Sequence, residues 1–449
     1  METSKIKKIL IANRGEIAVR IIRACREMGI TSVAICSDID KEAMHAQLAD
    51  ECICIGSYKL KDSYLNMERI LSAAIAADVD AIHPGFGFLS ENSKFVKMCQ
   101  ECNFNFIGPS MESMEKMGNK SEARRVMIEA GIPVIPGGDT PYDDAYEAKK
   151  EADAMGYPVI IKAVSGGGGK GMRIVESGEE FLELFQTAQK ESENAFGDRN
   201  MYLEKYLPNC RHIEVQILAD KHGNVVHLGE RDCSIQRKHQ KIIEETPSVA
   251  VSDELRKKLG ETAVKAAKAA KYHSAGTIEF LLTPSGEFYF MEMNTRIQVE
   301  HPVTEEVTGV DLIKEMIKIA EGETLGFTQE DVIISGHSIE CRINAESPED
   351  NFAPCPGTIK ELHLPGGNGI RIDSAIYQGY KIPSCYDSMI AKLIVHASSR
   401  EIAIQKLKSA LSELVIEGVK TNADFQYQLI GEEAFRKGDV NWINHTYFS

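Results

Sequence analysis

The chain has 449 residues, of which 43% are apolar and 26% are charged, a composition typical of globular proteins. This length favours two or three domains, because single cores stop growing near about 250–300 residues. Lys and Arg number 51 against 67 Asp and Glu, and this net charge of −16 argues against a nucleic-acid partner. No apolar run approaches the ~18 residues that span a bilayer, so no membrane partner is expected.

The 11 cysteines are scattered through apparent core segments such as AICSD and IECRI. Reduced thiols in a cytoplasm fit this usage better than a disulfide framework does. The chain also enters a strand and a helix directly, without the apolar core of a signal peptide. A cytoplasmic location is therefore expected.

The N-terminal third alternates strand and helix patterns. Strands are expected over residues 7–13, 31–37, 80–85 and 104–110. A helix follows the first strand and stops at Gly29. Strands separated by helices predict a parallel, doubly wound sheet, which we assign to residues 1–115. The first turn, at residues 13–16, lacks the Gly-x-Gly-x-x-Gly pattern, which argues against a dinucleotide site.

The rest of the chain divides into two further regions, a second domain over 116–330 and a third over 331–449. In the second, a helix ends at Gly131 and a Pro- and Gly-rich stretch at 133–141 predicts a hinge. The elements expected after it are strand, loop and strand over 157–175, a strand over 200–207, hairpins over 211–234 and 275–294, and a helix over 253–271. The third region has short strands with many Gly and Pro over 338–346, 357–367, 370–376 and 388–397, and a helix over 399–416, which predicts an antiparallel-rich domain.

Four consecutive glycines, Gly166 to Gly169, lie between two strand patterns and are bracketed by Lys162 and Lys170. A flexible linker would be rich in polar residues on both sides. A glycine-rich hairpin with lysines instead suits a phosphate cover, because backbone N–H groups can approach the oxygens and ammonium groups neutralise them. The pattern is not a P-loop, because the Lys-Ser/Thr pair and the following helix are missing.

The hairpin over 275–294 carries Glu279, Glu292 and Asn294 among aromatic residues. Alternation predicts that Glu292 and Asn294 share a face with Phe288 and Phe290, with Glu279 nearby on the paired strand. Carboxylate and amide oxygens of this kind suit Mg²⁺ held partly by nucleotide phosphates. A surface ladder of salt bridges is the alternative, and the apolar neighbours disfavour it.

The segment NTRIQVEHPVTE places Arg296, Gln298 and Glu300 in phase with Glu292 if the strand continues to His301. An Arg fork can bind a planar oxyanion, and a carboxylate beside it can act as a base. Taken alone, such a pair is more often an ordinary salt bridge. The segment ERDCSIQRKHQKIIEE is dense in cations, which favours an anion-lined wall over a solvated loop; its cations are Arg231, Arg237, Lys238, His239 and Lys241.

Together these motifs resemble the biotin carboxylase family from about residue 5 to about residue 445. They are IANRGEIAVRIIRA, IHPGFGFLSEN, SGGGGKGM, ERDCSIQRKHQK, EMNTRIQVEHPVTE and ECRINAE, in family order. The resemblance implies a mixed α/β and α+β fold: a Rossmann-like first domain, an ATP-grasp domain with a mobile lid at about 134–207, and a C-terminal domain. It also implies that ATP and bicarbonate yield carboxyphosphate, whose carboxyl group passes to N1′ of biotin.

The resemblance also assigns roles by motif position. The implied nucleotide contacts are Lys120, Lys162, Gly168, Gly169, Glu204, Lys205, Tyr206, Leu207, His212 and His239, with Glu279 and Glu292 at the phosphates. Glu279, Glu292 and Asn294 are the implied ligands of Mg²⁺ or Mn²⁺, with two ions accompanying ATP. Lys241, Arg296 and the Val299 backbone are the implied bicarbonate pocket. Glu300 is the implied base, with Arg296 expected to lower its pKa, and Arg342 is implied to stabilise the biotin enolate.

The chain has no Met-Lys-Met biotin-acceptor motif and no carboxyltransferase region. The implied partners are therefore a separate biotin carboxyl carrier protein, carboxyltransferase subunits and a second copy in a homodimer. The acceptor could be acetyl-CoA, as in fatty acid synthesis, or alternatively propionyl-CoA or pyruvate. The sequence also leaves open a different ATP-grasp ligase, which RIQVEHPVTE disfavours, and a nucleotide-sensing scaffold without turnover. Phe86 and Lys170 stand where many relatives have Tyr and Arg.

Overall fold

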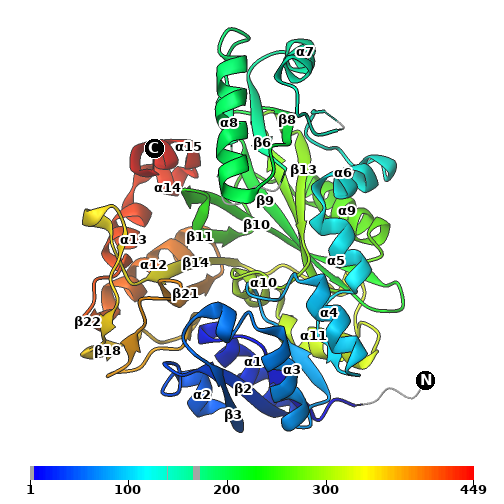
Figure 1. Ribbon diagram of the computed structural model, residues 1–449. Coiled ribbons are helices and arrows are strands. Elements are labelled where there is room, and N and C mark those ends of the chain that lie inside the picture. The colour runs from blue at the N-terminus through cyan, green and yellow to red at the C-terminus, as the bar shows by residue number, and fades with distance from the viewer. Residues whose placement is uncertain (1–4, 139, 165–171, 449) are drawn as a thin grey trace.

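The computed structural model describes residues 5–138, 140–164 and 172–448. Figure 1 shows the N-terminal domain in blue at the bottom, a central sheet in green, a separate lobe at the top and the C-terminal region in yellow to red on the left. The hinge predicted at 133–141 lies where the chain leaves the central region for this upper lobe.

The N-terminal domain contains a five-stranded parallel sheet of order β3-β2-β1-β4-β5. Its strands are β1 (Lys8–Ile11), β2 (Thr31–Ser37), β3 (Glu51–Gly56), β4 (Ala81–His83) and β5 (Asn105–Phe106), and its helices are α1 (Gly15–Met28), α2 (Met44–Leu48), α3 (Met67–Ala76) and α4 (Ser93–Glu101). The doubly wound prediction is confirmed, and α1 ends where expected, with Gly29 in the left-handed region at φ 70°. The edge strand β3 was not predicted, because half-exposed residues interrupt its apolar pattern.

The central sheet has eight strands in the order β13-β12-β9-β10-β11-β14-β21-β19, and each neighbouring pair is antiparallel. The strands are β9 (Arg211–Ala219), β10 (Val225–Arg237), β11 (Gln240–Thr246), β12 (Ser274–Leu282), β13 (Phe288–Asn294), β14 (His337–Asn344), β19 (Ile370–Ser374) and β21 (Met389–Ala397). Because β11 pairs with β14, one sheet runs through the predicted boundary at residue 330.

The two faces of this sheet differ in polarity although both are buried. On β9, Ile213, Val215 and Ile217 pack into an apolar core with the helices of one face. The helices of that core are α5 (Met111–Gly118), α6 (Lys120–Glu129) and α9 (Asp253–Ala269). The alternate residues of β9, which include Glu214 and Gln216, are polar and fully buried on the other face. Strand alternation therefore directs the polar side chains toward α10 (His301–Thr308) and α11 (Leu312–Glu321).

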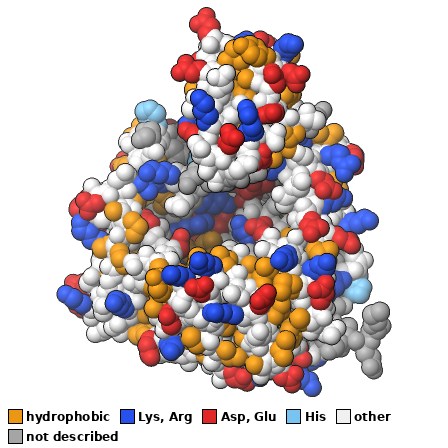
Figure 2. Space-filling model, viewed as in Figure 1, with side chains coloured by type: hydrophobic (Ala, Val, Ile, Leu, Met, Phe, Trp, Pro, Cys, Tyr) orange, Lys and Arg blue, Asp and Glu red, His pale blue; other side chains and the backbone are white. Residues whose placement is uncertain are grey.

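The upper lobe has its own three-stranded sheet and its own core. Its elements are β6 (Val159–Ala163), β7 (Met172–Val175), β8 (Met201–Lys205), α7 (Ala145–Met155) and α8 (Phe181–Phe196). Phe181 and Phe185 stack at 5.7 Å between ring centroids and pack on the sheet. Strands β6 and β7 are antiparallel, as predicted on either side of the glycine loop. Figure 2 shows a hollow below this lobe, with Lys and Arg side chains on its floor.

The C-terminal region adds short paired strands and four helices around a separate apolar core. These are β15 (Glu346–Ser347), β16 (Ala353–Pro354), β17 (Gly357–Thr358), β18 (Glu361–His363), β20 (Lys381–Ile382), β22 (Val415–Glu417), α12 (Arg400–Glu413), α13 (Ala423–Gly431), α14 (Glu433–Lys437) and α15 (Val440–Phe448). The strand predicted over 357–367 is thus two short strands. Among the described residues, no helix is long and apolar enough to cross a membrane.

Candidate active site

Four charged residues lie in one row across the polar face of the central sheet. Glu292 on β13 pairs with Glu279 on β12, Glu279 with Glu214 on β9, and Glu214 with Arg231 on β10. Adjacent carboxylates repel one another when water is excluded, so they require cations or hydrogen-bond donors. Burial and then Glu279 raise the pKa of Glu292.

A β-bulge fixes which side chains share this face. Glu279 pairs with Glu292, but the next residue, Phe280, pairs with Phe290, so Met291 is the extra residue. Phe290 therefore packs into the apolar core with Phe288 instead of beside Glu292. The prediction that these phenylalanines share the face of Glu292 was wrong, because one extra residue reverses the alternation.

The Glu279 carboxylate accepts hydrogen bonds or ion pairs from four side chains. The donors are His212 Nε2 at 2.7 Å, Lys241 Nζ at 3.2 Å, Asn294 Nδ2 at 2.7 Å and Gln298 Nε2 at 3.0 Å. Gln236 Nε2 lies 2.7 Å from His212 Nδ1, which places the ring proton on Nε2, toward Glu279. Although burial opposes it, Lys241 holds the pKa of Glu279 well below its usual range. Glu279 is therefore a carboxylate at neutral pH.

Lys241 on β11 is the cation at the centre of the site. Its Nζ lies 2.5 Å from Glu214 Oε2 and 2.6 Å from Glu300 Oε1, in addition to its contact with Glu279. Burial favours a neutral amine, but these three carboxylates raise the pKa of Lys241 well above its usual value. Lys241 therefore stays charged and can attract a small anion.

Glu300 lies at the start of a helix, not on an extension of β13. The strand ends at Asn294, and Glu300 caps α10, in which Pro302 occupies the first turn. The expected continuation of the strand was wrong, because His301 and Pro302 begin the helix. The Glu300 side chain is 1% exposed and lies between Lys241 and Arg342, whose Nη2 is 3.0 Å from Glu300 Oε2.

The cations that hold Glu300 ionised differ from the expected one. Burial raises its pKa, but Lys241, then Arg342 and then Arg231 lower it well below the usual value. Arg296 was expected to have this role, yet its guanidinium bonds to other groups. Arg342 also donates from Nε to Glu244 at 2.7 Å, and burial raises the pKa of Glu244 to about 7.

Arg296 presents its fork to three neighbours. Its Nε donates to Glu91 Oε2 at 2.8 Å, Nη1 to Gln298 Oε1 at 2.5 Å and Nη2 to Asn294 Oδ1 at 3.0 Å. Glu91 also accepts from the backbone N–H of Thr295 at 3.0 Å. Glu91 comes from the N-terminal domain and had no predicted role, although it lies in the motif IHPGFGFLSEN.

The anion-lined wall predicted over ERDCSIQRKHQK is only partly formed. Arg231 is fully buried and donates to Glu214, Gln216, Thr277 and Thr304, so it is a structural cation inside the protein. Arg237 stacks on Phe352, with its guanidinium carbon 4.2 Å from the ring centroid. Lys238 and His239 form the exposed turn between β10 and β11. Only Lys241 reaches the cluster of carboxylates.

The predicted nucleotide contacts of the lobe lie apart from this cluster. Lys162 on β6 forms an ion pair with Glu204 on β8, and Lys205 Nζ donates to the carbonyls of Gly156 and Tyr157. Tyr206 and Leu207 follow β8 and are half-buried, and Lys120 is the first residue of α6. Gly168, Gly169 and Lys170 lie outside the described residues.

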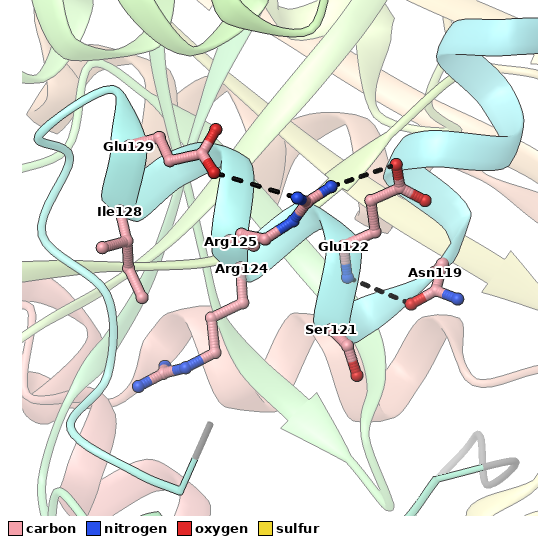
Figure 3. A pocket seen from close by; sticks show the side chains of 7 residues that line it. All are labelled: Asn119, Ser121, Glu122, Arg124, Arg125, Ile128 and Glu129. Carbon is pink, nitrogen blue, oxygen red and sulfur yellow. Dashed lines mark hydrogen bonds and ion pairs between the residues drawn. The ribbon is translucent and has the colours of Figure 1, made fainter. Parts of the chain in front are cut away.

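A second hollow, of about 640 Å³, lies along the outer face of α6 (Figure 3). Arg125 forms long ion pairs there with Glu122, at 3.7 Å, and Glu129, at 3.9 Å. These side chains are mostly exposed, and such ion pairs contribute little free energy. The groups that can bind a charged substrate lie instead on the polar face of the central sheet.

Glu279, Glu292 and Asn294 fit a hard divalent cation. All three supply oxygen, the element that Mg²⁺ and Mn²⁺ prefer, and they lie on paired strands. The raised pKa of Glu292 shows that its negative charge is disfavoured beside Glu279, and a cation between them relieves this repulsion.

Comparisons with known proteins agree with this geometry. Family models match three consecutive stretches: "Biotin carboxylase, N-terminal domain" over residues 5–114, "Carbamoyl-phosphate synthase L chain, ATP binding domain" over 119–328 and "Biotin carboxylase C-terminal domain" over 340–445. The chain is 55% identical over 437 residues to Biotin carboxylase 1 of Bacillus subtilis, and the match covers 97% of both chains. The chain belongs to the biotin carboxylase family.

Solved structures give the same result. A biotin carboxylase from Campylobacter jejuni, described as a complex with β,γ-ATP, has a TM-score of 0.95 at 50% identity over 98% of this chain and 99% of that one. The biotin carboxylase domain of a 2-oxoglutarate carboxylase from Hydrogenobacter thermophilus, described as a dimer with MgADP, ADP and bicarbonate, has a TM-score of 0.93 at 50% identity, covering 97% of this chain and 96% of that one. A pyruvate carboxylase subunit from Methanothermobacter thermautotrophicus is 53% identical, over 98% of this chain and 89% of that one.

The family and the fold confirm several predictions from the sequence. The protein is an ATP-grasp enzyme of the ligase class, and its activity is the ATP-dependent carboxylation of biotin with bicarbonate and Mg²⁺. The individual roles of the residues and the domain boundaries stay predictions.

Proposed function

We propose that this chain carboxylates biotin held on a separate biotin carboxyl carrier protein, with Glu300 as the base that removes the bicarbonate proton. The observation that carries the assignment is the position of Glu300, which is buried and held between Lys241 at 2.6 Å and Arg342 at 3.0 Å. An anion bound beside Lys241 competes for that cation and so raises the pKa of Glu300 toward the range useful to a base.

In the proposed first step, a bicarbonate oxygen attacks the γ-phosphorus of ATP, ADP leaves and the bicarbonate proton passes to Glu300. Lys241, Arg296 and the Val299 backbone hold the bicarbonate. In the second step, the carboxyl group of carboxyphosphate passes to N1′ of biotin, and phosphate leaves. Arg342 stabilises the negative charge of the biotin enolate, which one well-placed donor can do by ~3–4 kcal/mol.

The nucleotide is proposed to lie between the lobe and the central sheet. Its contacts are Lys120, Lys162, Gly168, Gly169, Glu204, Lys205, Tyr206, Leu207, His212 and His239. The hollow under the lobe, with basic side chains on its floor, supports this placement (Figure 2). Glu279, Glu292 and Asn294 would hold Mg²⁺ or Mn²⁺, which when bound neutralises phosphate charge.

The proposed acyl acceptor of the complete system is acetyl-CoA, which makes this reaction the first half of fatty acid precursor synthesis. Pyruvate is the second candidate, because a relative named as a pyruvate carboxylase subunit is 53% identical. Carboxyltransferase subunits, a homodimer and a cytoplasmic location are part of the same proposal, supported by the dimer described for the Hydrogenobacter domain and by 11 cysteines without disulfides. Isolation of the native complex and identification of its carboxyltransferase tests the acceptor.

The residue roles are tested by measuring phosphate release and carboxybiotin formation in two variants. Glu300→Gln keeps the shape but removes the base, so ATP cleavage with bicarbonate should fall by ~10²–10⁴-fold, with or without biotin. Arg342→Ala should keep the slow ATP cleavage, because Lys241 still contacts Glu300, yet lose carboxybiotin formation. Arg125→Ala, on the outer face of α6, is the matched control. Normal carboxybiotin yield in Arg342→Ala, or normal ATP cleavage in Glu300→Gln, contradicts the assignment.

A further inference from the structure

Lys392 is a fully buried lysine in the middle of β21. Within the central sheet it pairs with Arg342 on β14 at one side and with Asp373 on β19 at the other. A lysine is almost never fully buried unless it is paired, because the ammonium group loses its hydration. This position therefore requires specific partners.

The ammonium group of Lys392 contacts two other parts of the chain. Its Nζ donates to the backbone carbonyl of Val299 at 2.8 Å and lies 3.1 Å from Glu16 Oε1. Val299 directly precedes Glu300, and Glu16 is in the first turn of α1, in the N-terminal domain. One buried side chain thus links all three predicted domains at the peptide that leads into the proposed base.

The surrounding charges keep Lys392 protonated. Burial lowers its pKa, but Glu16, then Glu340 and then Asp373 raise it above the usual value, while Arg371 opposes them. The pKa of Glu340, which is fully buried, is also well above its usual value, so Glu340 is neutral at neutral pH. Lys392 and Glu16 then form the ion pair, and the Val299 carbonyl is the neutral acceptor beside it.

Glu16 could satisfy the charge of Lys392 without any help from Val299. The hydrogen bond to the carbonyl has a separate consequence, because it fixes the plane of the Val299–Glu300 peptide. That plane sets the direction of the Val299 N–H and the start of the Glu300 side chain. A misplacement of about 1 Å in a reacting group can reduce a rate by about 10²-fold.

We propose that Lys392 is a positioning residue for the bicarbonate half-reaction, which orients Val299 and Glu300 through its hydrogen bond to the Val299 carbonyl. The inference rests on the proposed role of Glu300 as the base. Lys392 touches neither ATP nor bicarbonate in this assignment, so its loss should affect bicarbonate use and leave nucleotide binding intact.

The test uses the intact protein and the double variant Lys392→Met/Glu16→Gln, which removes both charges together. Methionine retains much of the lysine stem, and the neutral glutamine avoids an uncompensated buried carboxylate. The double variant should fold, keep its KM for ATP within about twofold, and lose about 10–100-fold in kcat/KM for bicarbonate. Glu16→Gln alone should stay near the wild type, because Lys392 still bonds to Val299.

A wild-type kcat/KM for bicarbonate in the folded double variant overturns the inference, and so does an equal loss toward ATP and bicarbonate. If the double variant does not fold, Lys392→Arg is measured in the same way, because it keeps the charge but moves the donor. A raised KM for bicarbonate alone supports the inference, and an unchanged one overturns it. Glu300→Gln is measured in parallel: if it remains active, the proposed base is wrong, whereas an inactive Glu300→Gln beside a normal Lys392 variant rejects only the role of Lys392.

Discussion

At the scale of single residues, the site is a balance of buried charges. Three carboxylates, Glu214, Glu279 and Glu300, surround the one ammonium group of Lys241. Arg231 and Arg342 supply further positive charge from opposite sides. Removal of one member leaves another buried charge without a partner, which typically destabilises a protein by about 3–5 kcal/mol. The residues at the mouth of the site are therefore better targets for functional tests than those inside it.

Glu292→Ala is such a test, because Glu292 is more exposed than Glu279 and carries no part of the apolar core. The variant should lose Mg²⁺-dependent ATP turnover while its thermal unfolding stays cooperative, since it loses a metal ligand and no packing. Turnover is measured across a Mg²⁺ titration, with unfolding followed by circular dichroism. Glu287→Ala, in the exposed turn of the same hairpin, is the control. Near-normal turnover of Glu292→Ala at saturating Mg²⁺ means that the metal binds elsewhere.

At the scale of elements, the lobe and its glycine loop supply the proposed cover of the nucleotide. Gly168 lies outside the described residues, so its role follows from the motif and from the flanking strands β6 and β7. Gly168→Val should raise the KM for ATP by about tenfold or more, because a side chain blocks close backbone approach to phosphate. Steady-state kinetics measure this. Gly326→Val, at a position with open space around it, is the control, and an unchanged KM for Gly168→Val supports the linker interpretation.

The contact between β11, β14 and α12 should depend on pH. Glu245 accepts from His337 at 2.9 Å and from Arg400 at 2.6 Å. Burial opposes the effect, but these partners lower the pKa of Glu245 from 4.5 to about 2. A lowered pKa stabilises the fold above the unfolded value, near pH 4.5, and this contribution is lost as the pH falls toward 2.

Glu245→Gln should therefore lower the free energy of unfolding by about 3 kcal/mol at pH 7, and the difference from the wild type should shrink below pH 4.5. Urea denaturation at pH 7, 5 and 3.5 measures the difference, with Glu361→Gln, on the exposed strand β18, as the control. A difference that does not change between pH 7 and 3.5 contradicts the assignment of this stability to the ionised carboxylate.

The elements show how far the sequence predicts the structure. Strand alternation located the β9–β10 and β12–β13 hairpins within a few residues, because each has a polar and an apolar face. Alternation could not locate the bulge at Met291, since an extra residue changes which side chains share a face without changing composition. It also could not predict the contact between Arg296 and Glu91, which are 205 residues apart. Such contacts depend on how the domains pack.

At the scale of the whole molecule, no single domain contains the site. The central sheet carries Glu279, Lys241 and Arg342 on one continuous surface that extends into the C-terminal region. The N-terminal domain adds Glu91 beside Arg296, and Glu16 beside Lys392. The site is thus assembled only when the three regions pack together.

The most direct measurement is the transfer of radiolabelled bicarbonate to a purified biotinylated carrier protein, with ATP and Mg²⁺, followed together with ADP formation. We expect label on the carrier in a one-to-one ratio with the ADP formed in excess of the carrier-free rate. We expect no label without ATP, none on this chain itself, and a ~10²–10⁴-fold lower rate for Glu300→Gln. Absence of label on the carrier with the wild-type protein, or an undiminished rate for Glu300→Gln, would contradict this account.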